Sequence, residues 1–381
     1  MKRFLWSVID LFRNIFFFKS KRDNRLYIFR DNQTSLAKTE EIIRRIKYFE
    51  SSSDLVFLES IPPIKWIDFS RIILLAHNKH ILKRIKLKRN EVFNLDFDNN
   101  YSDAWEYHRL LSGIRNNDIF KEISLGKMRL KTLRDKLTKD YSKAYIFGTG
   151  PSLEKAISEN FKDGIRIVCN TIVKDEEIWL HIDPHLIVAA DAIYHFGMGQ
   201  FARSFRSDLN KRLSSTKTYF VYPAIFHSFC KIAFSKYEER LIPIPNGSIS
   251  TIHHDLTEKY GLSSHGNVLV SMLLPLACTF SRHIFLWGFD GRAPGDKLFW
   301  KNSSRHFYEE QVHELINLHP AFYKTLVPEE APELYVKKFH GTVLDRAMAK
   351  AESEGFHFTM MHETHTETLQ KRYAKHLKIK L

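Results

Sequence analysis

The stretch Tyr145-Ile146-Phe147-Gly148-Thr149-Gly150-Pro151-Ser152-Leu153 decides the fold. A short apolar run leads directly into a glycine-rich turn, and a helical pattern follows. This order is typical of the point where a strand meets a phosphate-binding loop in a doubly wound α/β domain. Glycines let the backbone approach a phosphate closely, and the first amides of the next helix face the anion. The motif predicts a nucleotide or nucleotide-sugar site held by Gly148, Thr149, Gly150, Pro151 and Ser152.

Further apolar runs continue the β/α alternation after this motif. We expect buried strands at 166–170, 186–191, 218–222 and 283–288, with helical spacers between them, and a last strand at 356–358. Short runs of β-branched and aromatic residues are typical of parallel strands. The pattern predicts an α/β fold with a doubly wound, mostly parallel, Rossmann-like sheet. Asn267 is expected to cap a helix that reaches about Thr279 with a kink at Pro275, and another helix is expected over 345–354.

Four segments are expected along the chain. Residues 1–22 mix large apolar residues with cations and predict a basic amphipathic segment, which either lies on anionic lipid or packs on its own domain. Residues 23–142 form an additional N-terminal α/β region of unknown role, with strands at 26–29, 55–58 and 72–75 and helices at 38–49 and 102–140. Residues 143–365 form the nucleotide-sugar-binding catalytic domain, and residues 366–381 a basic C-terminal helix.

The charge balance indicates an anionic partner. Lys and Arg number 58 against 44 Asp and Glu, which gives a formal net charge of +14 in 381 residues. Phosphorylated substrates, acidic membrane surfaces and nucleic acids all meet this description. No helix-turn-helix, RNA-recognition or zinc pattern supports specific nucleic-acid binding. The three cysteines lie far apart, which fits a reduced cytosolic protein, and no apolar run is long enough to predict a transmembrane helix.

Polar residues follow several of the predicted strands. The second ends at Asn170, the third at Asp191, and the fifth at Gly288-Phe289-Asp290. Ligands in doubly wound sheets bind beyond the carboxyl ends of the strands. Asn and Asp are also ordinary turn residues, but several of them along one sheet edge favour a site. The loop lacks the third glycine of the dinucleotide fingerprint and the lysine of a Walker A loop, which disfavours NAD binding and P-loop hydrolysis.

These residues together resemble glycosyltransferase family 42, the bacterial sialyltransferases that use CMP-linked sugars. The resemblance rests on Gly-x-Gly-Pro-Ser-Leu, then Cys-Asn at the end of the next strand, then an apolar strand ending in Gly-Phe-Asp, and covers about residues 143–365. It implies a GT-A-like sialyltransferase variant of the fold. It also implies that His340, five residues before Asp345, is the catalytic base. The Gly-Pro-Ser-Leu element is shared with flagellin-modifying nonulosonate transferases and a pterin pyrophosphokinase-like group.

The chain departs from the family pattern at several positions. Thr149 and Asp191 stand where asparagines are usual, and His265-Gly266-Asn267 replaces a Thr-Ser-Gly. The family's two tyrosines that assist the departing phosphate are not found at matching spacing, and Arg292 and Lys297 occupy that stretch. Tyr308, Tyr323 and Tyr335 are more distant candidates for this role.

The expected reaction is an inverting transfer of a CMP-activated nonulosonate. His340 would take the proton of the acceptor hydroxyl, and Arg292 would balance the charge of the leaving phosphate. The loop would hold the phosphate, Asn170 and Asp191 would hold the ribose or sugar, and the site would be lined by Asn267, Gly288 and Asp290. No cofactor and no metal are expected, because CMP carries a single phosphate. The pairs His362/His365 and His253/His254 are expected to be solvated surface pairs.

The expected acceptor is a surface glycan or lipid-linked glycan of lipopolysaccharide or capsule type, met at the inner face of the cytoplasmic membrane. The anionic membrane surface is then a partner, and association of several copies is left open. One alternative is a Mg²⁺-dependent pterin-type pyrophosphokinase, which would need ATP. The other is a basic nucleic-acid-binding protein, whose binding would weaken steeply with salt.

Overall fold

The computed structural model describes residues 25–29, 34–58, 72–74, 92–96, 98–115, 119–249, 253–263, 267–293, 303–326 and 336–375. The amphipathic segment expected at residues 1–22 lies outside these ranges. The chain divides after Asp96 into two compact units, and each is described by itself.

The described part of the first unit contains a four-stranded parallel sheet with the strand order β2-β1-β3-β4. Its elements are β1 (Arg25–Phe29), α2 (Leu36–Phe49), β2 (Asp54–Leu58), β3 (Ile72–Leu74) and β4 (Val92–Asn94). Helix α2 begins after Ser35, whose hydroxyl accepts a hydrogen bond from the Lys38 amide at 3.2 Å. The three predicted strands and the predicted helix of this region are confirmed.

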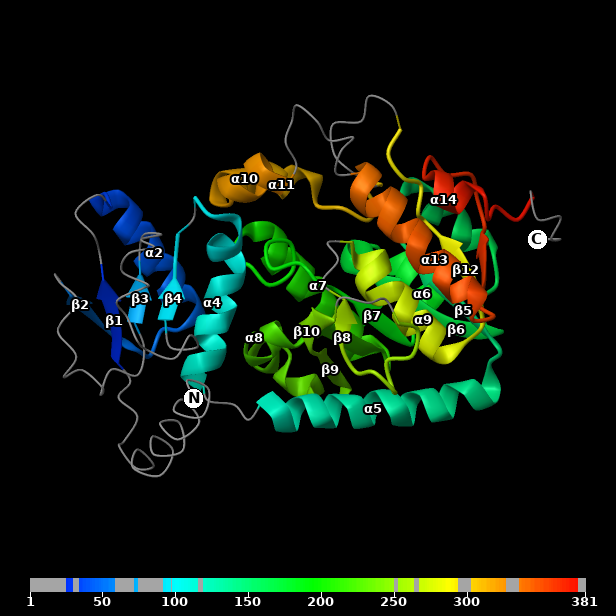
Figure 1. Ribbon diagram of the computed structural model, residues 1–381, viewed down its shortest axis with the longest axis horizontal. Coiled ribbons are helices and arrows are strands. Elements are labelled where there is room, and N and C mark those ends of the chain that lie inside the picture. Colours follow the sequence, from blue (N-terminus) through cyan, green and yellow to red (C-terminus); the bar gives the residue numbers. More distant parts are fainter. Residues whose placement is uncertain are drawn as a thin grey trace, which may run out of the picture. The chain divides into compact units, whose positions relative to one another are not determined.

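The described part of the second unit is built on a seven-stranded sheet with the order β13-β12-β5-β6-β7-β8-β9, in which all neighbours are parallel (Figure 1). The doubly wound, Rossmann-like α/β prediction is therefore confirmed. The strands are β5 (Lys143–Phe147), β6 (Gly164–Cys169), β7 (Leu186–Val188), β8 (Tyr219–Pro223), β9 (Leu241–Ile244), β12 (His283–Trp287) and β13 (His357–Met360). A separate short pair joins β10 (Asn246–Ile249) and β11 (Leu262–Ser263).

Helices connect these strands and cover both faces of the sheet. The α-helices are α4 (Asn100–Arg115), α5 (Ile119–Asp140), α6 (Glu176–Ile182), α7 (Gln200–Ser215), α8 (His227–Ala233), α9 (Leu274–Phe280), α10 (Val312–Leu318), α11 (Pro320–Leu326), α13 (Val343–Ser353) and α14 (Glu367–Gln370). Short 3-10 helices include η2 (Pro151–Ser158) and η3 (Asn170–Lys174). The connector expected at 102–140 belongs to the fold of this second unit, because the Arg129 guanidinium of α5 donates to the Leu241 carbonyl of β9 at 2.9 Å.

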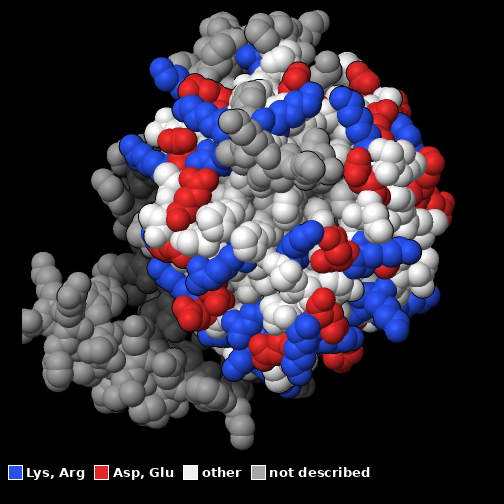
Figure 2. Space-filling model, turned by 90° about the vertical axis from the view of Figure 1, so that its right-hand side faces the viewer, with Lys and Arg blue, Asp and Glu red and all other residues white. Residues whose placement is uncertain are grey.

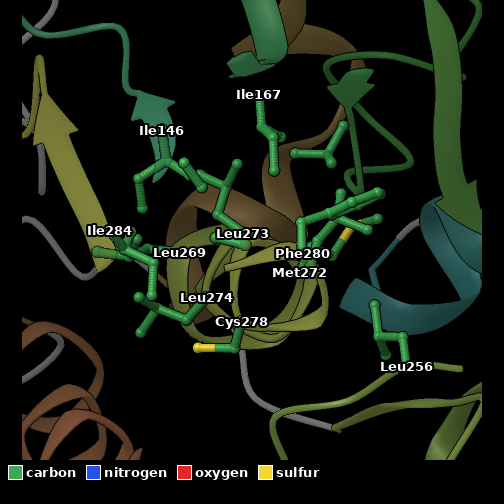
Figure 3. Close-up of a cluster of buried hydrophobic side chains, with 14 of the residues drawn as sticks. Ile146, Ile167, Leu256, Leu269, Met272, Leu273, Leu274, Cys278, Phe280 and Ile284 are labelled. Carbon is green, nitrogen blue, oxygen red and sulfur yellow. The ribbon is translucent and has the colours of Figure 1, made fainter. Parts of the chain in front are cut away.

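Alternate residues of each strand enter one of two hydrophobic cores. Phe147 and Trp287 face the first core with helices α6, α7 and α8, whereas Ile146 and Ile284 face the second. Helices α5, α9 and α13 cover the second core. Figure 3 shows the strand side chains of this second core converging on the helical segment that carries Leu273. Because both faces are covered, the strands are apolar on both sides, as the sequence predicts.

Strand β9 is missing from the sequence prediction. Its Leu-Ile-Pro-Ile sequence contains Pro243, which has no backbone N–H and argues against a central strand. In the structure β9 is the last strand at one edge of the sheet, where Pro243 lies opposite Tyr222 of β8. An edge position tolerates a proline because one side of the strand has no partner to receive a hydrogen bond.

The helix expected after Asn267 is confirmed, with a distortion where Pro275 was expected to kink it. Residues Leu269–Leu273 form a π-helical segment (η6), and α9 continues from Leu274. Pro275 cannot donate to the preceding turn, and a wider turn accommodates this loss.

The basic C-terminal helix predicted for 366–381 is wrong in its described part. Helix α14 ends at Gln370, and Tyr373 forms a parallel β-bridge with Met360 beside the sheet. Tyr373 and Ala374 are buried, so this stretch packs against the fold instead of continuing as a solvated helix. Across the described ranges, no helix has the length and apolar character needed to cross a membrane.

Candidate functional site

The sheet topology defines one switch point. Strands β6 to β9 extend from β5 in one direction, whereas β12 and β13 lie on its other side, so the strand order reverses between β5 and β12. In open α/β sheets ligands bind at such a switch point, beyond the carboxyl ends of the strands. The glycine-rich loop follows β5, and Gly288-Phe289-Asp290 follows β12. The structure therefore brings these two predicted site segments together.

Tight backbone contacts join the two segments. The Gly148 amide donates to the Trp287 carbonyl at 2.8 Å, and the Gly150 amide donates to the Gly288 carbonyl at 2.8 Å. A Cβ atom on Gly148 would lie 2.6 Å from the Gly288 oxygen, and one on Gly150 would lie 2.7 Å from the same oxygen. Gly288 has a φ of +71°, which favours glycine. These three glycines are required by the close approach of the loops.

Ser152 and Asp290 are bonded to each other across this switch point. The Ser152 amide donates to both carboxylate oxygens of Asp290 at 3.2 Å, and the Ser152 hydroxyl donates to Oδ1. Pro151 begins helix η2, so the Ser152 amide is one of the amides at the helix start that cannot bond within the helix. An anion is favoured there, and in this structure the chain's own carboxylate supplies it.

Asn170 lies at the end of β6, directly beside the glycine-rich loop's strand in the sheet. Its φ is +51°, an uncommon backbone conformation for a residue other than glycine. The side-chain Oδ1 is buried and, among the described residues, has no hydrogen-bond partner. A strained residue with an unsatisfied acceptor at this edge is the kind of feature found at binding sites.

Asp191 follows β7, one strand further along. Its Oδ1 accepts from the amides of Ile193 at 2.7 Å and Tyr194 at 3.0 Å, so the carboxylate shapes the turn. Burial raises the pKa of Asp191. The Tyr194 hydroxyl bonds to the Tyr323 hydroxyl of α11 at 2.8 Å, and burial raises the pKa of Tyr323, with Asp191 adding to the effect. Tyr194 was missed by the sequence analysis, although its position three residues after Asp191 is typical of such a turn.

The other predicted site residues have different surroundings. Asn267 is buried, and its Oδ1 accepts from the Leu269 amide at 2.8 Å, which uses this oxygen as a helix cap. Arg292 is half-buried in the turn that follows Asp290. Tyr308 is buried, and its hydroxyl donates to Asp208 at 2.7 Å. Lys297 and Tyr335 lie outside the described residues.

His340 lies in a short π-helical segment, η8 (Lys337–Thr342), directly before α13. The structure describes the backbone of His340 but not its side chain. The role of His340 as the catalytic base therefore stays a prediction. The start of the following helix at Val343 and the position of Asp345 in its first turn agree with the expected helix.

The segment 303–308 packs against the loop that follows β5. The Ser303 amide donates to the Thr149 carbonyl at 3.3 Å, and the Ser303 hydroxyl donates to Glu154 of η2. Arg305 forms an ion pair with Asp175 at 2.7 Å, and this buried carboxylate also caps α6 through the Ile178 amide. The Ser303 amide thus holds the Thr149 carbonyl, and the other bonds anchor this segment to η2 and α6.

Two histidine predictions are wrong. His362 is buried, and its Nε2 accepts from the Gly288 amide at 2.8 Å while Nδ1 donates to the Glu363 carbonyl. Burial lowers the pKa of His362, which keeps it neutral and able to accept. His254 is also buried and bonds to Glu354 at 2.7 Å. Residue spacing alone could not reveal that both rings are covered by neighbouring elements.

His254 and Glu354 line a cavity of about 570 Å³ beside the amino ends of strands β12 and β13. Residues that precede β12 and β13, including Arg282 and Phe356, complete its wall. The cavity is therefore separate from the switch point. Cys278, another of its lining residues, is a free cysteine, and burial raises the pKa of its thiol.

On the face shown in Figure 2, basic and acidic side chains are interspersed. The surplus of cations does not form one continuous basic surface there. Comparison with protein-family models, with curated proteins and with solved structures found no match to this chain.

Proposed function

We propose that this protein is an inverting glycosyltransferase that moves a CMP-activated nonulosonate, sialic acid or a relative, onto a glycan or lipid-linked glycan at the cytoplasmic membrane face. The observation that supports this most directly is the switch point of the sheet, where the glycine-rich loop and Asp290 meet. The sequence resemblance to glycosyltransferase family 42 supplies the donor class.

Residues that follow β6, β7 and β12, with Tyr323 of α11, have the chemistry for the donor. Asn170 offers a free acceptor, and an amide side chain can pair with a base or a hydroxyl. One hydroxyl of the Tyr194–Tyr323 pair donates to the other, so the pair would have one O–H to donate to a phosphate oxygen, and a raised pKa keeps Tyr323 protonated at physiological pH. Arg292 would add positive charge near the leaving group.

The proposed step is a single displacement. The acceptor hydroxyl gives its proton to His340 as its oxygen bonds to the anomeric carbon, while the bond from that carbon to the phosphate oxygen breaks. CMP leaves with the electron pair, and the configuration at carbon inverts. A histidine is suited to this proton transfer near neutral pH. Hydrogen-bond donors and cations aimed at the departing phosphate stabilise the charge that develops.

A thermal-shift panel with CMP, CDP, UDP, GDP and ATP, each with and without Mg²⁺, tests the donor class. A ligand present at ~100 times its Kd stabilises a protein by about 2.7 kcal/mol. Selective stabilisation by CMP without Mg²⁺ is the expected result. His340→Ala should then keep CMP binding and lower sugar transfer by roughly 10²- to 10⁴-fold.

Other outcomes of the same panel would overturn the proposal. Stabilisation by ATP only with Mg²⁺ would favour a pyrophosphokinase. The absence of any nucleotide shift, together with salt-sensitive binding of DNA or RNA, would favour a nucleic-acid-binding protein.

A further inference from the structure

The anion position of the glycine-rich loop is filled by the protein itself. The amide and hydroxyl of Ser152 both donate to the Asp290 carboxylate. Gly150 leaves room for this carboxylate, since a Cβ there would lie 2.9 Å from the Asp290 Cγ. A donor phosphate could take these two hydrogen bonds only by expelling Asp290, because two anions do not share one position.

The turn that carries Asp290 is fixed from several directions. His362 holds the Gly288 amide at 2.8 Å, the Thr364 hydroxyl donates to the Phe289 carbonyl at 2.7 Å, and the His365 amide donates to the Asp290 carbonyl at 2.8 Å. Gly291, next to Asp290, has a φ of +74° and lies against Thr366. These bonds fix the backbone from which the Asp290 side chain reaches Ser152, so the carboxylate is a built part of the site.

The negative charge of the Asp290 carboxylate decides which chemical groups of a ligand can bind beside it. It repels phosphate oxygens and accepts hydrogen bonds from hydroxyl groups, and its two oxygens can accept about four such bonds. Ser152 uses only part of this capacity, and Asp290 is half-buried, so the carboxylate remains reachable. A vicinal diol, which places two hydroxyl donors side by side, matches a carboxylate best.

We propose that Asp290, positioned by Ser152, determines specificity by binding a vicinal diol of the donor, and that the glycine-rich loop holds this carboxylate instead of the donor phosphate. This inference rests on the proposed function. The diol belongs either to the ribose or to the sugar, and both have the same chemistry toward a carboxylate.

Calorimetric titration of CMP, 2′-deoxy-CMP and CMP-sialic acid tests the inference on the wild-type protein, Asp290→Asn and Asp290→Ala. The Asn variant keeps the shape and an acceptor for Ser152 but removes the charge. We expect Asp290→Asn to weaken CMP binding about tenfold or more and to leave 2′-deoxy-CMP binding unchanged, if the ribose supplies the diol. If the sugar supplies it, only binding of CMP-sialic acid weakens.

The opposite result has a distinct signature. If the loop holds the phosphate and Asp290 only blocks it, both variants bind CMP more tightly than the wild type, which overturns the inference while the proposed function stands. Unchanged affinity for all three ligands overturns it as well. Failure of the wild-type protein to bind any of the three removes the proposed function itself. Ser152→Ala, which keeps Asp290, gives a second readout and should lower the same affinities in the same order.

Discussion

Gly150 is the residue at which the geometry of the candidate site is most restrictive. Its amide bonds to the Gly288 carbonyl, and its α-carbon faces the Asp290 carboxylate. No larger residue fits without moving one of these backbones.

We predict that Gly150→Ala destabilises the protein by about 1–3 kcal/mol, the usual range for an overpacked site. The new methyl group would meet the Gly288 oxygen at 2.7 Å and the Asp290 carboxylate. Urea denaturation measures the change in the free energy of unfolding. Gly341→Ala is the matched control, since the nearest described atom to a Cβ there is the Val336 oxygen at 3.9 Å. Equal stability of both variants and the wild type would contradict the described loop contact.

The sequence predicted the positions of some site residues but not the contacts that others make. Asn170 was predicted because a polar residue follows an apolar run, and its strained backbone agrees with a special position. The bond between Ser152 and Asp290 was not predicted, because a motif cannot show that a carboxylate 138 residues away already occupies its donors. The positions of His362 and His254 were predicted wrongly for a similar reason, since burial depends on distant elements.

The strands and helices of the second unit were largely predicted because each strand is apolar on both faces and is bounded by turn residues. Four short strands were missed, namely β4 in the first unit and β9, β10 and β11 in the second. Pro243 hid β9, and β4 has only three residues between more polar neighbours. The order of strands around β5 was not predicted, because parallel pairing joins residues that are distant in sequence.

At the level of elements, we predict that the helix-covered second core carries much of the stability. Leu273→Ala should cost about 2–5 kcal/mol, because Leu273 is fully buried among leucines and isoleucines from the sheet and helices (Figure 3). Leu180→Ala in α6 is the control, with a side chain 52% exposed and an expected change within about 0.5 kcal/mol. Urea denaturation compares the two variants, and a cost for Leu180→Ala as large as that for Leu273→Ala would contradict the core assignment.

For the whole molecule, buried histidines predict acid sensitivity. Burial lowers the pKa of three of the described histidines, His108, His185 and His195, from 6.5 to about 3. Between these values the unfolded chain binds protons that the folded chain does not. Their contribution to stability is therefore complete above pH ~6.5 and is lost progressively as the pH falls toward 3.

Thermal unfolding between pH 7.5 and 4.5 measures this effect. Each such histidine contributes a slope of about 1.4 kcal/mol per pH unit in that window. His108→Phe should make the pH dependence less steep, because the ring of His108 packs among phenylalanines, with its centroid 4.8 Å from that of Phe226, and a phenyl ring has no proton to bind. A melting temperature that stays constant from pH 7 to pH 5 in the wild type would contradict the prediction.

The pairing of β5 with β12 also has a consequence for how the chain acquires its site during synthesis. The loop after β5 and the turn after β12 come from positions far apart in the sequence, since Ser152 and Asp290 are 138 positions apart. During synthesis, the glycine-rich loop is made well before β12, the strand that completes the site. Strands β6 to β9 are also made before β12 and can extend the sheet on one side of β5, while the other side of β5 stays an unpaired edge. The site is therefore completed late in the synthesis of each chain, and a product truncated before β12 would have a partial sheet and no switch point.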